Sequence, residues 1–108
     1  MIEKCLGKID FAEFGTYKER PFLMGLQLGF SMSGSGVMDG GKYTVNISKY
    51  CRWEPEERFD AITSMVDHID SILKDAKVNY VSELVGKPVE ITLKDNTFVD
   101  FRILTEVL

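Results

Sequence analysis

The segment FLMGLQLGFSM, residues 22–32, constrains the fold more than any other part of the chain. Its large apolar side chains recur at every second position: Phe22, Met24, Leu26, Leu28, Phe30 and Met32. This alternation predicts a half-buried β-strand, because successive side chains of a strand point to opposite faces. The other face carries Gly25 and Gly29. Glycine weakens a strand, so we expect a neighbouring subunit, a packed helix or a ligand to approach the backbone closely there.

Two further strands are predicted in the first half of the chain. Residues 42–48, KYTVNIS, alternate in the same way, and a first strand is expected over about residues 2–14, with Ile9 and Phe11 on one face. The glycine-rich stretch GFSMSGSGVMDGGKY, residues 29–43, lies between the later two strands. It lacks the spacing and the following helix of a P-loop or a dinucleotide-binding motif. Two alternatives remain: a hairpin connection, or a loop whose backbone N–H groups hold a phosphate.

A long amphipathic helix is predicted over residues 54–77, EPEERFDAITSMVDHIDSILKDAK. Pro55 suits the first turn, and the acidic residues beside it favour the positive end of the helix dipole. Apolar residues recur at spacings of three and four and form one stripe: Phe59, Ile62, Val66, Ile69, Leu73 and Ala76. This stripe either covers the sheet of its own chain or pairs in part with a symmetry mate. Arg52 and Trp53, just before the helix, either anchor its start or stack on a base.

The C-terminal region is predicted to form a β-hairpin after a short helical turn at residues 80–87. Asp95-Asn96 is a favourable two-residue turn, because both residue types tolerate positive φ. In the returning strand, Phe98 and Arg102 are expected to share a face. The order of three strands, a long helix, a short helical turn and two strands predicts an α+β fold, with an antiparallel β-sheet and one long amphipathic helix.

Charge and composition narrow the classes of function. The net charge of −4 and the pI of about 5.0 argue against a surface for long nucleic acid, which requires many Lys and Arg side chains. Cys5 and Cys51 lie far apart and belong to no CxxC motif, so no metal site is expected. We expect a single domain over residues 1–108, with no signal peptide and no membrane span, in the cytoplasm.

Groups with catalytic potential are sparse in the sequence. His68, the only histidine, lies on the polar side of the predicted helix, and no Ser or Cys nucleophile is evidently paired with it. The acidic residues cluster at the start of the helix and on solvated faces, where they form no acid–base constellation. We therefore expect a protein that is not an enzyme and that needs no cofactor.

Arginine offers the clearest binding chemistry. Arg102 either binds phosphate with its guanidinium fork and stacks on a base, or forms a cross-strand ion pair with Asp100 or Glu90. The turn GTYKERP, residues 15–21, carries a second small basic spot that includes Arg20. That spot is either solvated or functional.

Motifs along nearly the whole chain together resemble those of small phage and prophage proteins that end in a strand like RILTEVL. In chain order they are KIDFAEFGTY, GLQLGFSMSGSGV, CRWEPEERFDAI, DAKV, GKPVEIT and RILTEVL. The group is similar to the first family of phage anti-Thoeris sponge proteins. The turn GTYKERP and the stretch SGSGVMDGGKY depart from the pattern of relatives, and both departures bear on which ligand is bound.

The resemblance implies a non-enzymatic function in the cytoplasm of a bacterial host. Such proteins sequester cyclic ADP-ribose isomers and, in some members, cyclic di- or trinucleotides, without cleaving them. It also implies a homo-oligomer, a dimer or a hexamer, with pockets between subunits. In the best-matched motif, Arg102 and Thr105 are carried over as ligand-binding residues. Chemistry and position add further candidates: Arg20, Ser33, Gly34, Ser35, Gly36, Asn96 and Phe98.

Two other functions remain open. A protein-binding inhibitor or a small structural phage module, with no nucleotide ligand, would act through the helix or an exposed sheet edge. A small enzyme acting on a nucleotide would convert its ligand, whereas a sponge releases it intact.

Overall fold

A computed structural model describes residues 1–48 and 54–108, so the expectations for Cys51, Arg52 and Trp53 lie outside the described residues. The elements in chain order are β1 (Ile2–Thr16), β2 (Leu23–Met32), β3 (Ser35–Met38), β4 (Thr44–Asn46), the helix α1 (Pro55–Ala76), the 3-10 helix η1 (Val81–Leu84), β5 (Pro88–Lys94), β6 (Thr97–Ile103) and the 3-10 helix η2 (Thr105–Val107). The predicted α+β architecture, an antiparallel sheet with one long helix, is confirmed.

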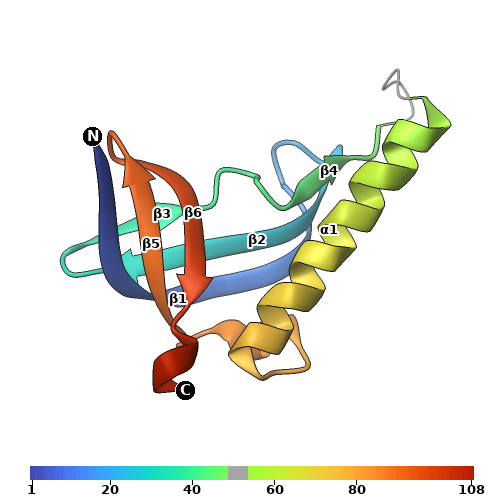
Figure 1. The fold of residues 1–108 in the computed structure, drawn as a ribbon. Helices are drawn as coiled ribbons and strands as arrows, with labels where there is room; N and C mark the ends of the chain where they lie inside the picture. The colour runs from blue at the N-terminus through green and yellow to red at the C-terminus, as the bar shows by residue number, and fades with distance from the viewer. Residues whose placement is uncertain (49–53) are drawn as a thin grey trace.

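The six strands of the described residues form one sheet with the order β3-β2-β1-β5-β6, and β4 pairs with β2 on the same side as β3. β1 serves both halves of the sheet, because residues 2–8 pair with β5 and residues 7–16 pair with β2. Figure 1 shows that β1 bends sharply, so that β5 and β6 cross the long ribbon of β1 and β2. Gly7 lies where the two pairings overlap, and a Cβ there would collide with the Ser31 carbonyl oxygen.

The glycine-rich stretch is more regular than a simple connection. Ser33 and Gly34 form a tight turn after β2, and Gly34 has a φ of +78°, which glycine adopts without steric cost. The chain then returns as β3, a strand that the alternation did not predict, and pairs with the end of β2. β4 pairs with the start of β2, at Leu23–Gly25, and is shorter than the predicted strand 42–48. The stretch is therefore a hairpin followed by a loop that joins β3 to β4.

A β-bulge in β1 changes which side chains face the core. The register between β1 and β2 shifts between Ile9 and Phe11, so these two residues lie on opposite faces. The prediction that they share a face is wrong, because one extra residue in a strand moves the period-two pattern by one position. Ile9 is fully buried, whereas 37% of Phe11 is exposed.

A second bulge in β6 has the same effect near the predicted ligand site. Leu93 pairs with Phe98, but Thr92 pairs with Asp100, so Val99 is the extra residue. Phe98 therefore points into the core, and the prediction that it shares a face with Arg102 is also wrong.

The core lies between the curved sheet and the C-terminal half of α1. Phe30 of β2 is at its centre, with ring centroids 5.3 Å from Phe98 and 4.9 Å from Phe101. The remaining fully buried large side chains are Ile9, Leu26, Leu28, Leu84, Ile91 and Val89. These side chains come from β1, β2, β5 and η1, so the core joins both halves of the sheet.

Gly25 shows what approaches the glycine positions of β2. A Cβ there would collide with the Tyr43 carbonyl oxygen and would come within 3.0 Å of the Met65 sulfur and within 2.7 Å of the Thr44 Cα. The expected close approach is therefore made by β4 and α1 of the same chain. β4 and α1 can pack here only because residue 25 has no side chain.

Only part of the predicted stripe of α1 packs against its own sheet. Ile69, Leu73 and Ala76 pack in the core, but toward the N-terminal end Phe59 is 71% exposed and Val66 is 54% exposed. In Figure 1 this end of α1 reaches past the sheet. We define the apolar stripe surface as Phe14, Phe59, Ile62 and Val66, all of them exposed. Within the described residues, no helix is long and apolar enough to cross a membrane.

Candidate functional site

A hollow lies on the face of β1, β2 and β3 that is turned away from the core. We call it the outer groove; its volume is about 310 Å³, and its lining consists of Phe11, Tyr17, Lys18, Glu19, Arg20, Gln27 and Met38. Gly29 shapes its floor, because a Cβ there would lie 3.0 Å from the Phe11 Cβ and 3.0 Å from the Met38 sulfur. A second hollow of about 290 Å³ continues from Met38 across Gly29 and Gly36.

The side chains of the outer groove combine the positive charges of Lys18 and Arg20, partly offset by the Glu19 carboxylate, with aromatic rings. The guanidinium carbon of Arg20 lies 5.4 Å from the centroid of the Tyr17 ring, a cation–π distance. Arg20 and Lys18 are both exposed, and the Phe11 ring is accessible from the groove. Gln27 adds an amide that can donate and accept hydrogen bonds. This set suits an anionic ligand that carries a flat ring.

The buried carboxylate of Asp39 supports both Tyr17 and the loop between β3 and β4. Only 3% of Asp39 is exposed, and its oxygens accept hydrogen bonds from the N–H groups of Leu28 and Gly41, both at 3.1 Å. The Tyr17 hydroxyl is a further hydrogen-bonding partner. Burial raises the pKa of Asp39, although its backbone donors oppose the rise. Burial, and next the negative charge of Asp39, raise the pKa of Tyr17.

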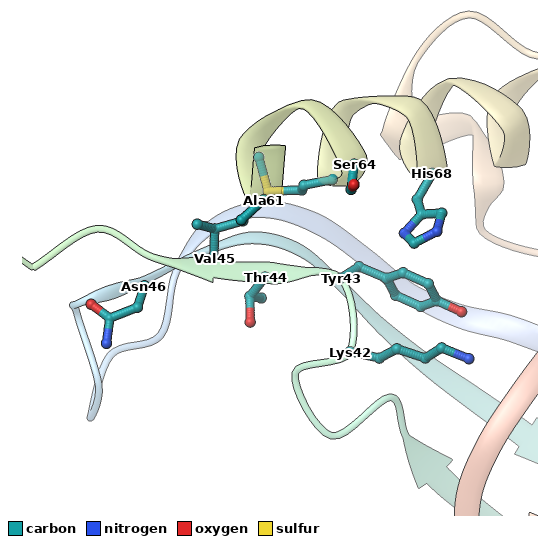
Figure 2. A pocket seen from close by; sticks show the side chains of 9 residues that line it. Lys42, Tyr43, Thr44, Val45, Asn46, Ala61, Ser64 and His68 are labelled. Atoms are coloured by element: carbon teal, nitrogen blue, oxygen red, sulfur yellow. The ribbon is translucent and has the colours of Figure 1, made fainter. Parts of the chain in front are cut away.

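A second groove runs between β4 and α1, and we call it the helix groove. Figure 2 shows its first lobe, of about 200 Å³, with Ser64 and His68 projecting from the helix toward the strand. A second lobe of about 260 Å³ shares Lys42, Tyr43 and His68 and continues along α1 to β6. The His68 ring meets the Tyr43 ring edge-on, with centroids 6.1 Å apart. His68 is exposed, as the sequence indicates, but it lines a groove.

Lys42 forms the contacts between β6 and the loop before β4 at the end of this groove. Its ammonium donates a hydrogen bond of 2.8 Å to the Val99 carbonyl and forms an ion pair of 3.1 Å with Asp100. The same nitrogen lies 5.9 Å from the centroids of the Tyr43 and Phe98 rings. Lys42 therefore ties the loop before β4 to β6, and Asp100 neutralises its charge.

Arg102 is held by carboxylates on the surface of the hairpin. Its Nε donates to Glu90 at 3.2 Å, and its Nη1 donates to Glu106 at 3.2 Å. The hydrogen bond to Glu106, followed by that to Glu90, raises the pKa of Arg102. Of the two ion-pair partners expected for Arg102, Glu90 is the one it contacts, and Asp100 pairs with Lys42 instead. A phosphate could bind Arg102 only in competition with these carboxylates.

The other candidates from the sequence do not converge on one place within the chain. Arg20 lines the outer groove, Gly36 lines its continuation, and Thr105 begins η2 beside Glu106. Asn96 lies in the β5–β6 turn with a φ of 65°, and Asp95 has a φ of 51°, which confirms the predicted turn chemistry. Phe98 packs against the core, and the remaining three candidates are the exposed Ser33, Gly34 and Ser35 at the β2–β3 turn.

A comparison with protein-family models, with curated proteins and with solved structures finds no match for this chain. The residues that the structure describes also contain no group of three or more His, Cys, Asp or Glu side chains that could hold a metal ion. The assignment of a function therefore rests on the grooves themselves and on the resemblance in sequence.

Sequence reasoning missed three of the seven residues that line the outer groove. Tyr17 and Arg20 belong to the basic turn that the sequence did single out, but Phe11 and Gln27 come from the interiors of β1 and β2. Met38 comes from β3, which was not predicted. The one available signal was the bare strand face at Gly29, which indicated a place where other groups come close.

Proposed function

We propose that this protein is a phage-type anti-defence sponge, which binds a cyclic nucleotide immune signal in the bacterial cytoplasm and sequesters it without cleavage. The observation that carries the proposal is the juxtaposition of Lys18, Arg20, Tyr17 and Phe11 in the outer groove. Cyclic ADP-ribose isomers and cyclic di- or trinucleotides combine phosphate groups with flat bases, the two features that these side chains complement. The resemblance along the chain supports the same class of ligand.

The geometry suggests how such a ligand would lie. The Arg20 fork donates hydrogen bonds to a phosphate, and Lys18 adds a second positive charge. A base stacks on the exposed ring of Phe11, where the Gln27 amide can reach the edge of the base. The continuation of the groove passes Gly36, where the lack of a side chain leaves room for another part of the ligand, and the Asp10 carboxylate, which also lines it, disfavours a second phosphate there.

The first test mixes the protein with a panel of cyclic ADP-ribose isomers and cyclic oligonucleotides. Binding is measured as the shift in the thermal unfolding temperature. A ligand at a hundred times its dissociation constant should add roughly 2.7 kcal/mol to the free energy of unfolding. Mass spectrometry after denaturation should recover the ligand unchanged, because a sponge does not convert it. We expect Arg20→Ala to weaken binding by at least tenfold, about 1.4 kcal/mol, through loss of a charge-assisted phosphate contact.

Arg58→Ala is the matched control, since Arg58 lies on α1 outside both grooves. It should bind the ligand like the wild type. If Arg102→Ala loses the ligand and Arg20→Ala keeps it, the site is at the end of β6 and the outer groove is excluded. Recovery of a converted ligand would establish that the protein is an enzyme. The absence of a thermal shift with both ligand classes would contradict the sponge proposal.

We also propose that the sponge is a homo-oligomer, a dimer or a hexamer, that assembles through the apolar stripe surface. Phe14 and Val66 line a shared apolar hollow of about 260 Å³ together with Ile69 and Leu73, and burying such a surface is favourable. Light scattering after gel filtration should therefore give a multiple of the 12.3 kDa chain mass. Val66→Glu should shift the protein toward the monomer, because it places a charge in the interface.

Val85→Glu is a matched control, because Val85 is 51% exposed and lies outside the stripe. It should leave the oligomeric state unchanged. A wild-type monomer would favour the alternative function, in which the stripe docks on a host protein. A monomer that still binds nucleotide would support the sponge and contradict its assembly into an oligomer.

A further inference from the structure

Among the described residues, no strand pairs with the outer edge of β4. On its inner edge, the Leu26 N–H donates to the Tyr43 carbonyl at 3.1 Å, and the Ile47 N–H donates to the Phe22 carbonyl at 2.7 Å. Positions that exchange hydrogen bonds alternate along an antiparallel strand. The residues between them, Thr44 and Asn46, therefore direct their backbone groups to the outer edge.

Most of these outward groups lie on the edge of β4 that no described strand covers. The Thr44 N–H donates to the Gly41 carbonyl at 3.2 Å, and the alternation directs the Thr44 carbonyl and both Asn46 backbone groups to that edge. β4 pairs with β2 and with no other strand of the part that the structure describes. One donor and two acceptors are thus free to pair with an added strand.

The helix groove runs along this edge and has the dimensions of a peptide site. Ala61 and Ser64 are small and leave space above the strand, as Figure 2 shows. The two lobes extend along α1 from Ala61 to Ile72. At 1.5 Å per residue this is about 16 Å of helix, which corresponds to about five residues of extended chain.

The outer lip of the groove is acidic. A second stripe of α1 follows spacings of three and four on the same side of the helix as Ser64, and its members are Glu57, Asp60, Ser64, Asp67 and Ser71. All five are exposed, and the stripe contains no Lys or Arg. Lys42 lines both lobes of the groove, and its ammonium is already paired with Asp100. The lip therefore attracts positive charge.

We propose that the groove between β4 and α1 binds an extended basic peptide, which adds a strand to the outer edge of β4. The peptide backbone pairs with the free groups of Thr44 and Asn46. Alternate side chains point toward Ser64 and His68 or away from the helix. Lysine or arginine side chains along the peptide reach the carboxylates of Glu57, Asp60 and Asp67, which select a basic sequence.

The probe is fluorescein-labelled Lys-Val-Lys-Val-Lys, capped at both ends, with Glu-Val-Glu-Val-Glu as its acidic counterpart. We expect fluorescence anisotropy to show saturable binding of the basic peptide and at least tenfold weaker binding of the acidic one. In amide NMR spectra the Asn46 and Ser64 signals should shift. N-methylation of the basic peptide along one edge should reduce its affinity at least tenfold, because it removes the backbone donors.

Ser64→Leu fills the groove and should reduce affinity at least tenfold, while Ser82→Leu, on η1, should not. The proposal fails if the basic peptide does not bind, or if Ser64→Leu binds it as tightly as the wild type does. It also fails if shifts map to β3 and leave β4 unchanged, or if the Asn46 signal responds to protein concentration instead of peptide, which would show that a second copy occupies the edge.

Discussion

Replacing Gly25 by alanine should destabilise the protein by about 3 kcal/mol, close to the upper end of what overpacking costs. The new Cβ would collide with the Tyr43 carbonyl oxygen and crowd the Met65 sulfur at 3.0 Å. Neither neighbour can retreat easily, because the Tyr43 carbonyl accepts the hydrogen bond from Leu26 and Met65 is a buried residue of α1. Urea unfolding followed by circular dichroism measures the change.

Gly15 is the control for this substitution. It is the direct cross-strand partner of Gly25, yet nothing lies within 4 Å of a Cβ placed on it. Gly15→Ala should therefore stay within about 0.5 kcal/mol of the wild type or be slightly more stable. An equal decrease in the free energy of unfolding for the two variants would contradict this explanation. It would show that the decrease reflects strand geometry and not the packing of β4 and α1 on Gly25.

Replacing Asp39 by alanine should cost about 3 kcal/mol, because it leaves two backbone donors without their acceptor. The Leu28 N–H lies in the buried strand β2, and the Gly41 N–H begins the turn that carries Lys42. An unpaired buried donor costs about 1–3 kcal/mol. The comparison variant is Asp67→Asn, on the exposed side of α1, which should change the free energy of unfolding by less than about 0.5 kcal/mol.

The contribution of Asp39 should also depend on pH. Burial raises its pKa in the folded state, so the folded protein binds this proton more tightly than the unfolded chain does. The part of its stabilising effect that comes from this tighter proton binding is complete below the ordinary aspartate value, about pH 4, and is lost as the pH rises through the folded pKa. The wild type should therefore lose stability relative to Asp39→Asn as the pH rises above about 4. A difference that grows toward low pH in favour of the variant would contradict this sign.

The candidate sites were harder to foresee than the fold. Arg102 stood out in the sequence because an arginine between apolar residues suggests phosphate binding, but cross-strand pairing places it against Glu90 and Glu106. Arg20 was one of several candidates, and only the bulge at Asp10 brings the Phe11 ring to its side of the sheet. A bulge leaves no mark in the alternation of apolar residues, so the face of a side chain beyond it cannot be read from the pattern.

Local patterns determined the elements of this protein. Period-two alternation identified β2 and the C-terminal hairpin, spacings of three and four identified α1, and Asp95-Asn96 identified its turn, because each pattern follows from backbone geometry. Tertiary structure alone decided the rest. The bend of β1, the formation of β3, the two bulges and the partial burial of the helix stripe all depend on contacts between residues distant in sequence. Both grooves arise from those contacts, which is why their linings join residues that no local pattern connects.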